Sequence, residues 1–154
     1  MPGISTQTSV GAPPDRLFAV TLAADQIRGY ANWNPAFARG IRIIAETGGV
    51  GTVFETPLEA PGAIGRAEIV EYDPPRAMGS LVRGGVFREL RIRFTIEADG
   101  DGSRLTQTID YSLKYAPMSW LIDAMVLRGK LRASSAAQLA AMKERAEFFE
   151  RLAA

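Results

Sequence analysis

The chain has 154 residues, of which 47% are hydrophobic and 23% are charged, and its formal net charge is +1. It contains neither histidine nor cysteine, which excludes catalytic sites built on imidazole or thiolate and the metal sites that need those ligands. The small net charge gives no general attraction to nucleic acid, and we expect no nucleic-acid partner, no metal and no cofactor.

The length and composition are typical of one globular domain, which we expect to cover residues 1–154. Residues 1–10 are polar and lack the charged start and apolar run of a secretory signal, so we expect a cytoplasmic protein. Residues 116–127 form the most apolar later segment. They contain Asp123 and are well short of the roughly twenty residues that span a bilayer, which predicts no transmembrane segment.

The N-terminal region predicts a strand followed by two short helices. Residues 4–10 are Thr-rich and favour a strand, which Pro13 and Pro14 end. Pro14 also suits the first turn of a helix, and Asp15 adds favourable charge there. A second short helix is expected over residues 25–31, with Asp25 as its N-cap.

The middle of the chain changes to short β-compatible runs separated by Gly, Pro and Asp, the pattern of an antiparallel meander. The expected strands are residues 41–46, 51–58, 65–72, 77–83, 86–97 and 104–115. In the fifth, apolar residues such as Leu90 and Phe94 alternate with charged ones, so one face of the strand is expected to be buried and the other exposed to solvent. In the sixth, the same alternation places Gln107 and Tyr111 on the apolar side.

After Pro117, residues with high helix propensity take over to the end of the chain and predict one long helix. Its apolar stripe is expected to be Leu121, Met125, Leu131, Ser135, Leu139, Met142, Ala146 and Phe149. This helix is the only element long enough to cover a sheet face. The predicted fold is therefore α+β, a curved antiparallel sheet of about seven strands around a C-terminal helix, with an internal hollow.

Several segments in this order resemble the START-like (SRPBCC) superfamily, in the branch of polyketide cyclases, dehydrases and lipid-transport proteins. They are residues 9–18, Trp33-Asn34-Pro35, residues 70–76 and residues 102–106. The resemblance implies a helix-grip fold with an apolar cavity between the sheet and the terminal helix. It implies binding of a lipid, polyketide or other hydrophobic molecule, and it supplies no catalytic motif to carry over.

Ten residues are candidates for binding such a ligand: Tyr30, Trp33, Phe54, Arg88, Leu90, Gln107, Tyr111, Trp120, Leu121 and Met125. For Trp33 the alternative is a structural role that locks the second helix onto the sheet. Arg88 points inward if the alternation continues back from Leu90, and outward if a β-bulge lies near Gly84-Gly85. The region around Trp120 is interpreted as a lid over the ligand, or as core packing or a dimer contact.

We therefore expect binding or transport of a hydrophobic small molecule in an internal cavity. The alternative is a polyketide cyclase or dehydrase-like enzyme, in which Arg88 stabilises negative charge, Tyr111 relays a proton and a buried carboxylate is the base. A third interpretation is a protein-interaction module. A homodimer is compatible with the sequence.

Overall fold

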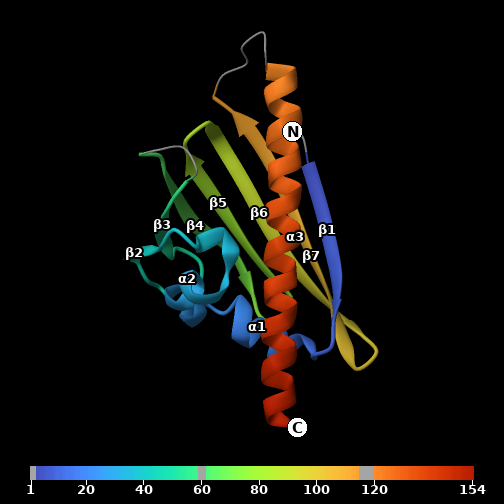
Figure 1. Cartoon of the computed structure of the whole chain (residues 1–154). Helices are drawn as coiled ribbons and strands as arrows, with labels where there is room; N and C mark the ends of the chain where they lie inside the picture. The colour runs from blue at the N-terminus through green and yellow to red at the C-terminus, as the bar shows by residue number, and fades with distance from the viewer. Residues whose placement is uncertain (1–2, 59–61, 115–119) are drawn as a thin grey trace.

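The computed structural model describes residues 3–58, 62–114 and 120–154, and the side chains of these except residues 120–124. Seven antiparallel strands form one sheet in the order β1-β7-β6-β5-β4-β3-β2, and helices cover one of its faces (Figure 1). The strands are β1 (Gly3–Val10), β2 (Arg42–Ala45), β3 (Val53–Pro57), β4 (Ile64–Asp73), β5 (Ala77–Gly84), β6 (Phe87–Asp99) and β7 (Gly102–Leu113). The α+β helix-grip prediction is confirmed.

The helices are α1 (Pro14–Thr21), the 3-10 helix η1 (Ala24–Gly29), α2 (Tyr30–Trp33), the 3-10 helix η2 (Pro35–Phe37) and α3 (Trp120–Ala153). The long helix α3 crosses the sheet near β1 and β7, and the N-terminal helices lie beside its C-terminal half (Figure 1). Within the described ranges, no helix has the length and apolar character needed to cross a membrane.

The alternation in the longest strands places their side chains as the sequence predicts. Along β7, buried side chains recur at every second position from Ser103 to Tyr111, and Gln107 is among them with 1% of its surface exposed. Because β6 and β7 pair in register, Phe94 lies opposite Gln107 and Leu90 opposite Tyr111 on the covered face. This face forms the main core.

The second helical segment differs from the prediction in its start and its type. It begins one residue earlier, as a 3-10 helix from Ala24, and no side chain caps its first turn, so the expected N-cap at Asp25 is wrong. The reason lies in tertiary contact, since the backbone N–H of Ala24 donates to the hydroxyl of Tyr72 on β4 at 3.0 Å. At η2, the Asn34 side chain accepts a hydrogen bond from the N–H of Ala36 and caps the turn.

The buried stripe of α3 holds the helix on β1 and α1. Leu139, Met142 and Ala146 are at most 1% exposed. Met125 was expected on the same stripe, and that expectation is wrong because 75% of its surface is exposed. It precedes Leu131 by six residues, which turns it about 120° away from the stripe at 3.6 residues per turn.

Candidate functional site

A pocket of about 30 Å³ lies between the covered face of the sheet, the N-terminal helices and α3. Segments from both ends of the chain contribute to it. Its side chains are Thr21, Leu22, Tyr30, Trp33, Asn34, Phe37, Phe54, Met78, Ser80, Ile92, Phe94, Gln138 and Met142. The predicted location between sheet and terminal helix therefore holds a real but small cavity.

Aromatic rings form one wall of the pocket. Tyr30 contacts Trp33 edge to face, with ring centroids 5.5 Å apart, and lies 5.1 Å from Phe37. Phe37 in turn lies 5.9 Å from Phe54 on β3. The row joins α2 and η2 to the sheet, and its offset and tilted contacts are the favourable geometries for aromatic pairs.

The opposite wall comes from two paired strands. Met78 of β5 lies directly across from Phe94 of β6, and Ser80 lies across from Ile92. Residues two apart on a strand point to the same face, so all four side chains reach the pocket. Sequence alternation predicted the β6 residues, whereas Ser80 gave no signal because a buried serine resembles a surface one.

A buried polar chain connects β7 to α3 next to the pocket. The hydroxyl of Ser135 donates to Oε1 of Gln107 at 2.5 Å, and Nε2 of Gln107 donates to Oε1 of Gln138 at 3.0 Å. Since Gln138 accepts through its oxygen, its amide N–H groups remain the end available to the pocket that it lines. Gln107 thus holds the side chain of Gln138, which lines the pocket.

Tyr30 has a fixed hydroxyl. It is 3% exposed, and its Oη donates to the backbone oxygen of Thr21 at 2.9 Å. Burial raises the pKa of Tyr30 well above its ordinary value of 10.0. The phenol is therefore neutral at physiological pH, and it contributes its ring to the pocket.

Trp33 lines the pocket with an unsatisfied polar atom. Its indole Nε1 is buried and has no hydrogen-bond partner among the described residues. An unpaired buried N–H costs about 1–3 kcal/mol, so native proteins rarely keep one without a reason. The ring also packs on Tyr30 of the same helix, and both roles expected for Trp33 stay predictions.

Arg145 of α3, which the sequence did not single out, lies over the ring of Trp33 with its guanidinium carbon 4.9 Å from the ring centroid. Its Nε donates to the backbone oxygen of Val20 at 2.7 Å, and its Nη2 donates to Oε1 of Gln26 at 3.0 Å. Burial lowers the pKa of Arg145, although an arginine remains charged at neutral pH. The sequence signal that could have identified Arg145 is its position three residues after Met142, which places it next to the buried stripe of the helix.

Three predicted residues lie on the covered face but not at this pocket. Leu90, Gln107 and Tyr111 are all at most 8% exposed, and none lines the cavity. Tyr111 packs edge to face on Phe87 with centroids 6.2 Å apart. Tyr30, Trp33 and Phe54, by contrast, are brought together around the pocket.

Arg88 is exposed, so of the two orientations that the sequence left open, the outward one with a β-bulge is the one found. The register between β6 and β7 shifts between Phe87 and Glu89, and this irregularity turns Phe87 inward in place of Arg88. Phe87 is 9% exposed, whereas Arg88 is exposed.

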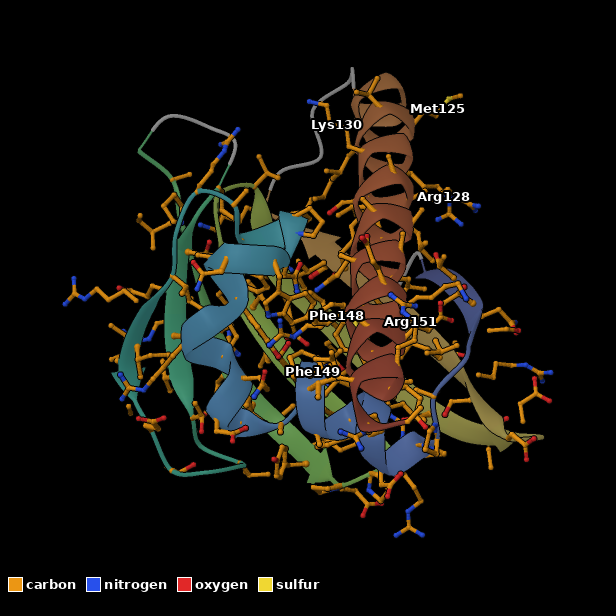
Figure 2. All side chains as sticks on the ribbon, turned by 60° about the horizontal axis from the view of Figure 1, so that its bottom comes forward. Met125, Arg128, Lys130, Phe148, Phe149 and Arg151 are labelled. Carbon is orange, nitrogen blue, oxygen red and sulfur yellow. The ribbon has the colours of Figure 1, made fainter. Side chains whose placement is uncertain are left out.

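Met125 is the one predicted lid residue among the binding candidates whose side chain is described, and it does not line the pocket. Met125 projects from α3 on a different flank from Phe149, which lies on the side of the N-terminal helices (Figure 2). The side chains of Trp120 and Leu121 lie outside the described residues. Their expected role in ligand binding stays a prediction.

The pocket is lined mainly by apolar side chains. Its lining contains no Asp, Glu, Lys or Arg, and no acidic side chain is buried among the described residues. The described part of the chain also shows no cluster of acidic groups that could hold a metal ion. The polar groups at the wall are the hydroxyls of Thr21, Tyr30 and Ser80, which can donate and accept, and N–H donors that include the indole of Trp33.

The family described as "Polyketide cyclase / dehydrase and lipid transport" matches residues 1–147. Comparison with curated proteins gives no match.

Solved structures share the fold at low sequence identity. The Zhui aromatase/cyclase from Streptomyces sp. R1128 has a TM-score of 0.79 and 18% identity, with 95% of this chain and 93% of that chain covered. A START superfamily protein from Mycobacterium smegmatis has a TM-score of 0.71 and 18% identity, with 96% and 98% covered. Norcoclaurine synthase from Thalictrum flavum has a TM-score of 0.70 and 17% identity, with 93% and 84% covered.

Proposed function

Since the chain belongs to the family of polyketide cyclases, dehydrases and lipid-transport proteins, we propose that it binds a hydrophobic small molecule in the pocket between the sheet and α3. The observation that carries the proposal is the pocket itself, whose walls are mainly aromatic and aliphatic. Its few polar groups converge from separate elements. This combination is typical of small-molecule sites, where apolar walls supply affinity and a few polar atoms supply orientation.

The size of the pocket implies that the ligand opens it. A volume of about 30 Å³ holds about two water molecules, whereas ligand sites typically measure about 300–1,000 Å³. Met78 and Met142 line opposite sides, and unbranched thioether side chains repack readily. We infer that the N-terminal helices and α3 separate from the sheet face when a ligand enters.

Overpacking the pocket tests the proposal. Ser80→Leu adds a branched side chain to the β5 wall, where Ser80 is 9% exposed, and overpacking typically costs about 1–3 kcal/mol of stability. Ser5→Leu makes the same change on an exposed strand position and serves as the matched control.

We expect saturable binding of a fluorescent fatty acid or a naphthalene dye to the native chain and to Ser5→Leu, and weaker binding to Ser80→Leu. Circular dichroism checks that each variant is folded. Equal affinity in a folded Ser80→Leu variant would place the ligand elsewhere, and no saturable binding of either probe to the native chain would refute the proposal.

Binding is favoured over the cyclase or dehydrase alternative by the same lining. That alternative needed Arg88, Tyr111 and a buried carboxylate in one cavity. Arg88 is exposed, Tyr111 does not line the pocket, and the described residues bury no carboxylate. Without a group that accepts a proton at neutral pH, the pocket can orient a substrate but lacks a general base.

A further inference from the structure

The charge of Arg145 has no carboxylate partner within ion-pair distance in the described part of the chain, although two nearby cations do. Lys143 on the same helix pairs with Glu147 at 2.6 Å, and Arg16 of α1 pairs with Glu150 of α3 at 3.4 Å. The acceptors of Arg145 are the neutral oxygens of Val20 and Gln26. One positive charge beside the pocket is therefore left without a negative partner.

Two aromatic rings hold this guanidinium in place. Its carbon lies 4.9 Å from the centroid of Trp33 and 5.0 Å from that of Phe149. Contacts of this kind stabilise a cation while they exclude water from it. The guanidinium is fixed by two hydrogen bonds and two rings, and its Nη1 has no hydrogen-bond partner among the described residues, so it is preorganised for a further partner.

Trp33 connects the charge to the pocket. Its ring carries Arg145 on one face, and its buried Nε1–H has no acceptor among the described residues. At the same pocket, Asn34 accepts a hydrogen bond from Ala36 through its oxygen, and Gln138 accepts one from Gln107 in the same way. Both amides thus keep N–H groups for the ligand. The hydroxyl oxygens of Thr21, Tyr30 and Ser80 also line the pocket and can accept, but the indole N–H of Trp33 has no acceptor among the described residues.

We propose that the ligand is a hydrophobic organic acid, whose carboxylate accepts a hydrogen bond from the indole N–H of Trp33 and is neutralised by Arg145. A carboxylate is acceptor-only when ionised and carries the missing negative charge. The apolar body lies along the aromatic and aliphatic walls. The inference rests on the proposed function, because it names the chemical class that the same pocket binds.

The test compares acids with neutral amides of the same shape by isothermal titration calorimetry. The probes are decanoic acid and naphthoic acid, each with its primary amide, against the full chain at neutral pH. We expect each acid to bind about tenfold or more tightly than its amide, a ratio that corresponds to about 1.4 kcal/mol. Equal affinities for acid and amide overturn the inference and leave the proposed function standing, whereas no binding of any probe refutes both.

Arg145→Gln removes the charge and keeps a donor. We expect it to abolish the preference for the acid, because acid binding weakens until its affinity is about that of the amide. Arg128→Gln is the matched control, since Arg128 lies on the same helix and also donates to a backbone oxygen, that of Gly3 at 2.8 Å. Preference for the acid that persists in folded Arg145→Gln, or that disappears equally in Arg128→Gln, overturns the assignment.

A measurement on the native chain does not depend on the folding of any variant. The chain has two tryptophans, so its nitrogen-proton spectrum contains two indole signals, and Trp33→Phe identifies that of Trp33. A new hydrogen bond from this N–H should shift its proton signal downfield on saturation with the acid, and less with the amide. An indole signal of Trp33 that stays in place at saturation overturns the inference.

Discussion

Replacing Gln107 by leucine should destabilise the protein, although leucine adds buried apolar surface, because two buried polar groups lose their hydrogen-bond partner. Gln107 is 1% exposed, accepts from Ser135 at 2.5 Å and donates to Gln138 at 3.0 Å. Leucine has neither the amide oxygen that accepts from Ser135 nor the amide N–H that donates to Gln138, so both hydrogen bonds are lost. The Ser135 hydroxyl, 1% exposed, then loses its acceptor, and the Gln138 oxygen loses its donor.

The magnitude follows from the two groups left behind. Each buried unsatisfied polar group costs about 1–3 kcal/mol, and leucine regains part of this through its apolar surface. We therefore expect Gln107→Leu to lower the free energy of unfolding by about 2–4 kcal/mol. Replacing all three residues, as in Gln107→Leu/Ser135→Ala/Gln138→Leu, removes the unsatisfied atoms and should recover most of that loss.

Urea unfolding followed by circular dichroism measures the effect. Gln7→Leu is the matched control, because Gln7 lies on β1 at an exposed position, and surface changes stay within about 0.5 kcal/mol. A loss below about 0.5 kcal/mol in Gln107→Leu, or a triple variant as unstable as the single one, would contradict the reasoning about the polar chain.

Three further predictions concern α3. Met142→Ala removes a side chain that is fully buried in the pocket wall, so it should destabilise by about 2–5 kcal/mol while it admits bulkier ligands, as unfolding and dye-binding measurements would show. Gly129→Ala should stabilise by about 0.5–1 kcal/mol, because a Cβ there meets nothing within 4 Å; a lower melting temperature would contradict this. Hydrogen bonds from Lys143 and from the backbone of Gly11 lower the pKa of Glu147 below its ordinary value of 4.5. Its contribution to stability is therefore present above that value and lost as the pH falls through the folded pKa, so Glu147→Gln should be less stable than the native chain at neutral pH, with the difference vanishing in acid. A difference that does not vary with pH would contradict the pKa direction.

Most of the fold could be predicted because local patterns and packing agree. The alternation along β6 and β7 fixes which face is buried, and Gly and Pro mark the turns between strands. Patterns failed where a tertiary contact decides the local structure. A hydrogen bond to Tyr72 accompanies the start of η1 at Ala24 in place of a cap at Asp25, and the alternation alone could not decide whether a bulge turns Arg88 outward.

The candidate site was only partly predictable, since its lining comes from both ends of the chain. Tyr30, Trp33 and Phe54 stood out as large rings among small residues. Ser80 did not, because its burial depends on strand pairing. Arg145 was missed for a similar reason. It lies at the edge of the buried stripe of α3, and its surroundings depend on the N-terminal helices that pack beside it.

The size of the cavity explains why recognition should depend on its polar atoms. Burying about 300 Å² of a ligand's apolar surface contributes about 7.5 kcal/mol to binding, whereas association costs about 4–15 kcal/mol in lost translational, rotational and conformational freedom. Opening a pocket of about 30 Å³ adds to that cost. Apolar contact alone therefore leaves little net affinity, and the donors of Trp33 and Gln138 with the charge of Arg145 must supply the difference. The preference between an acid and its amide measures this contribution directly, because the two share the same apolar body.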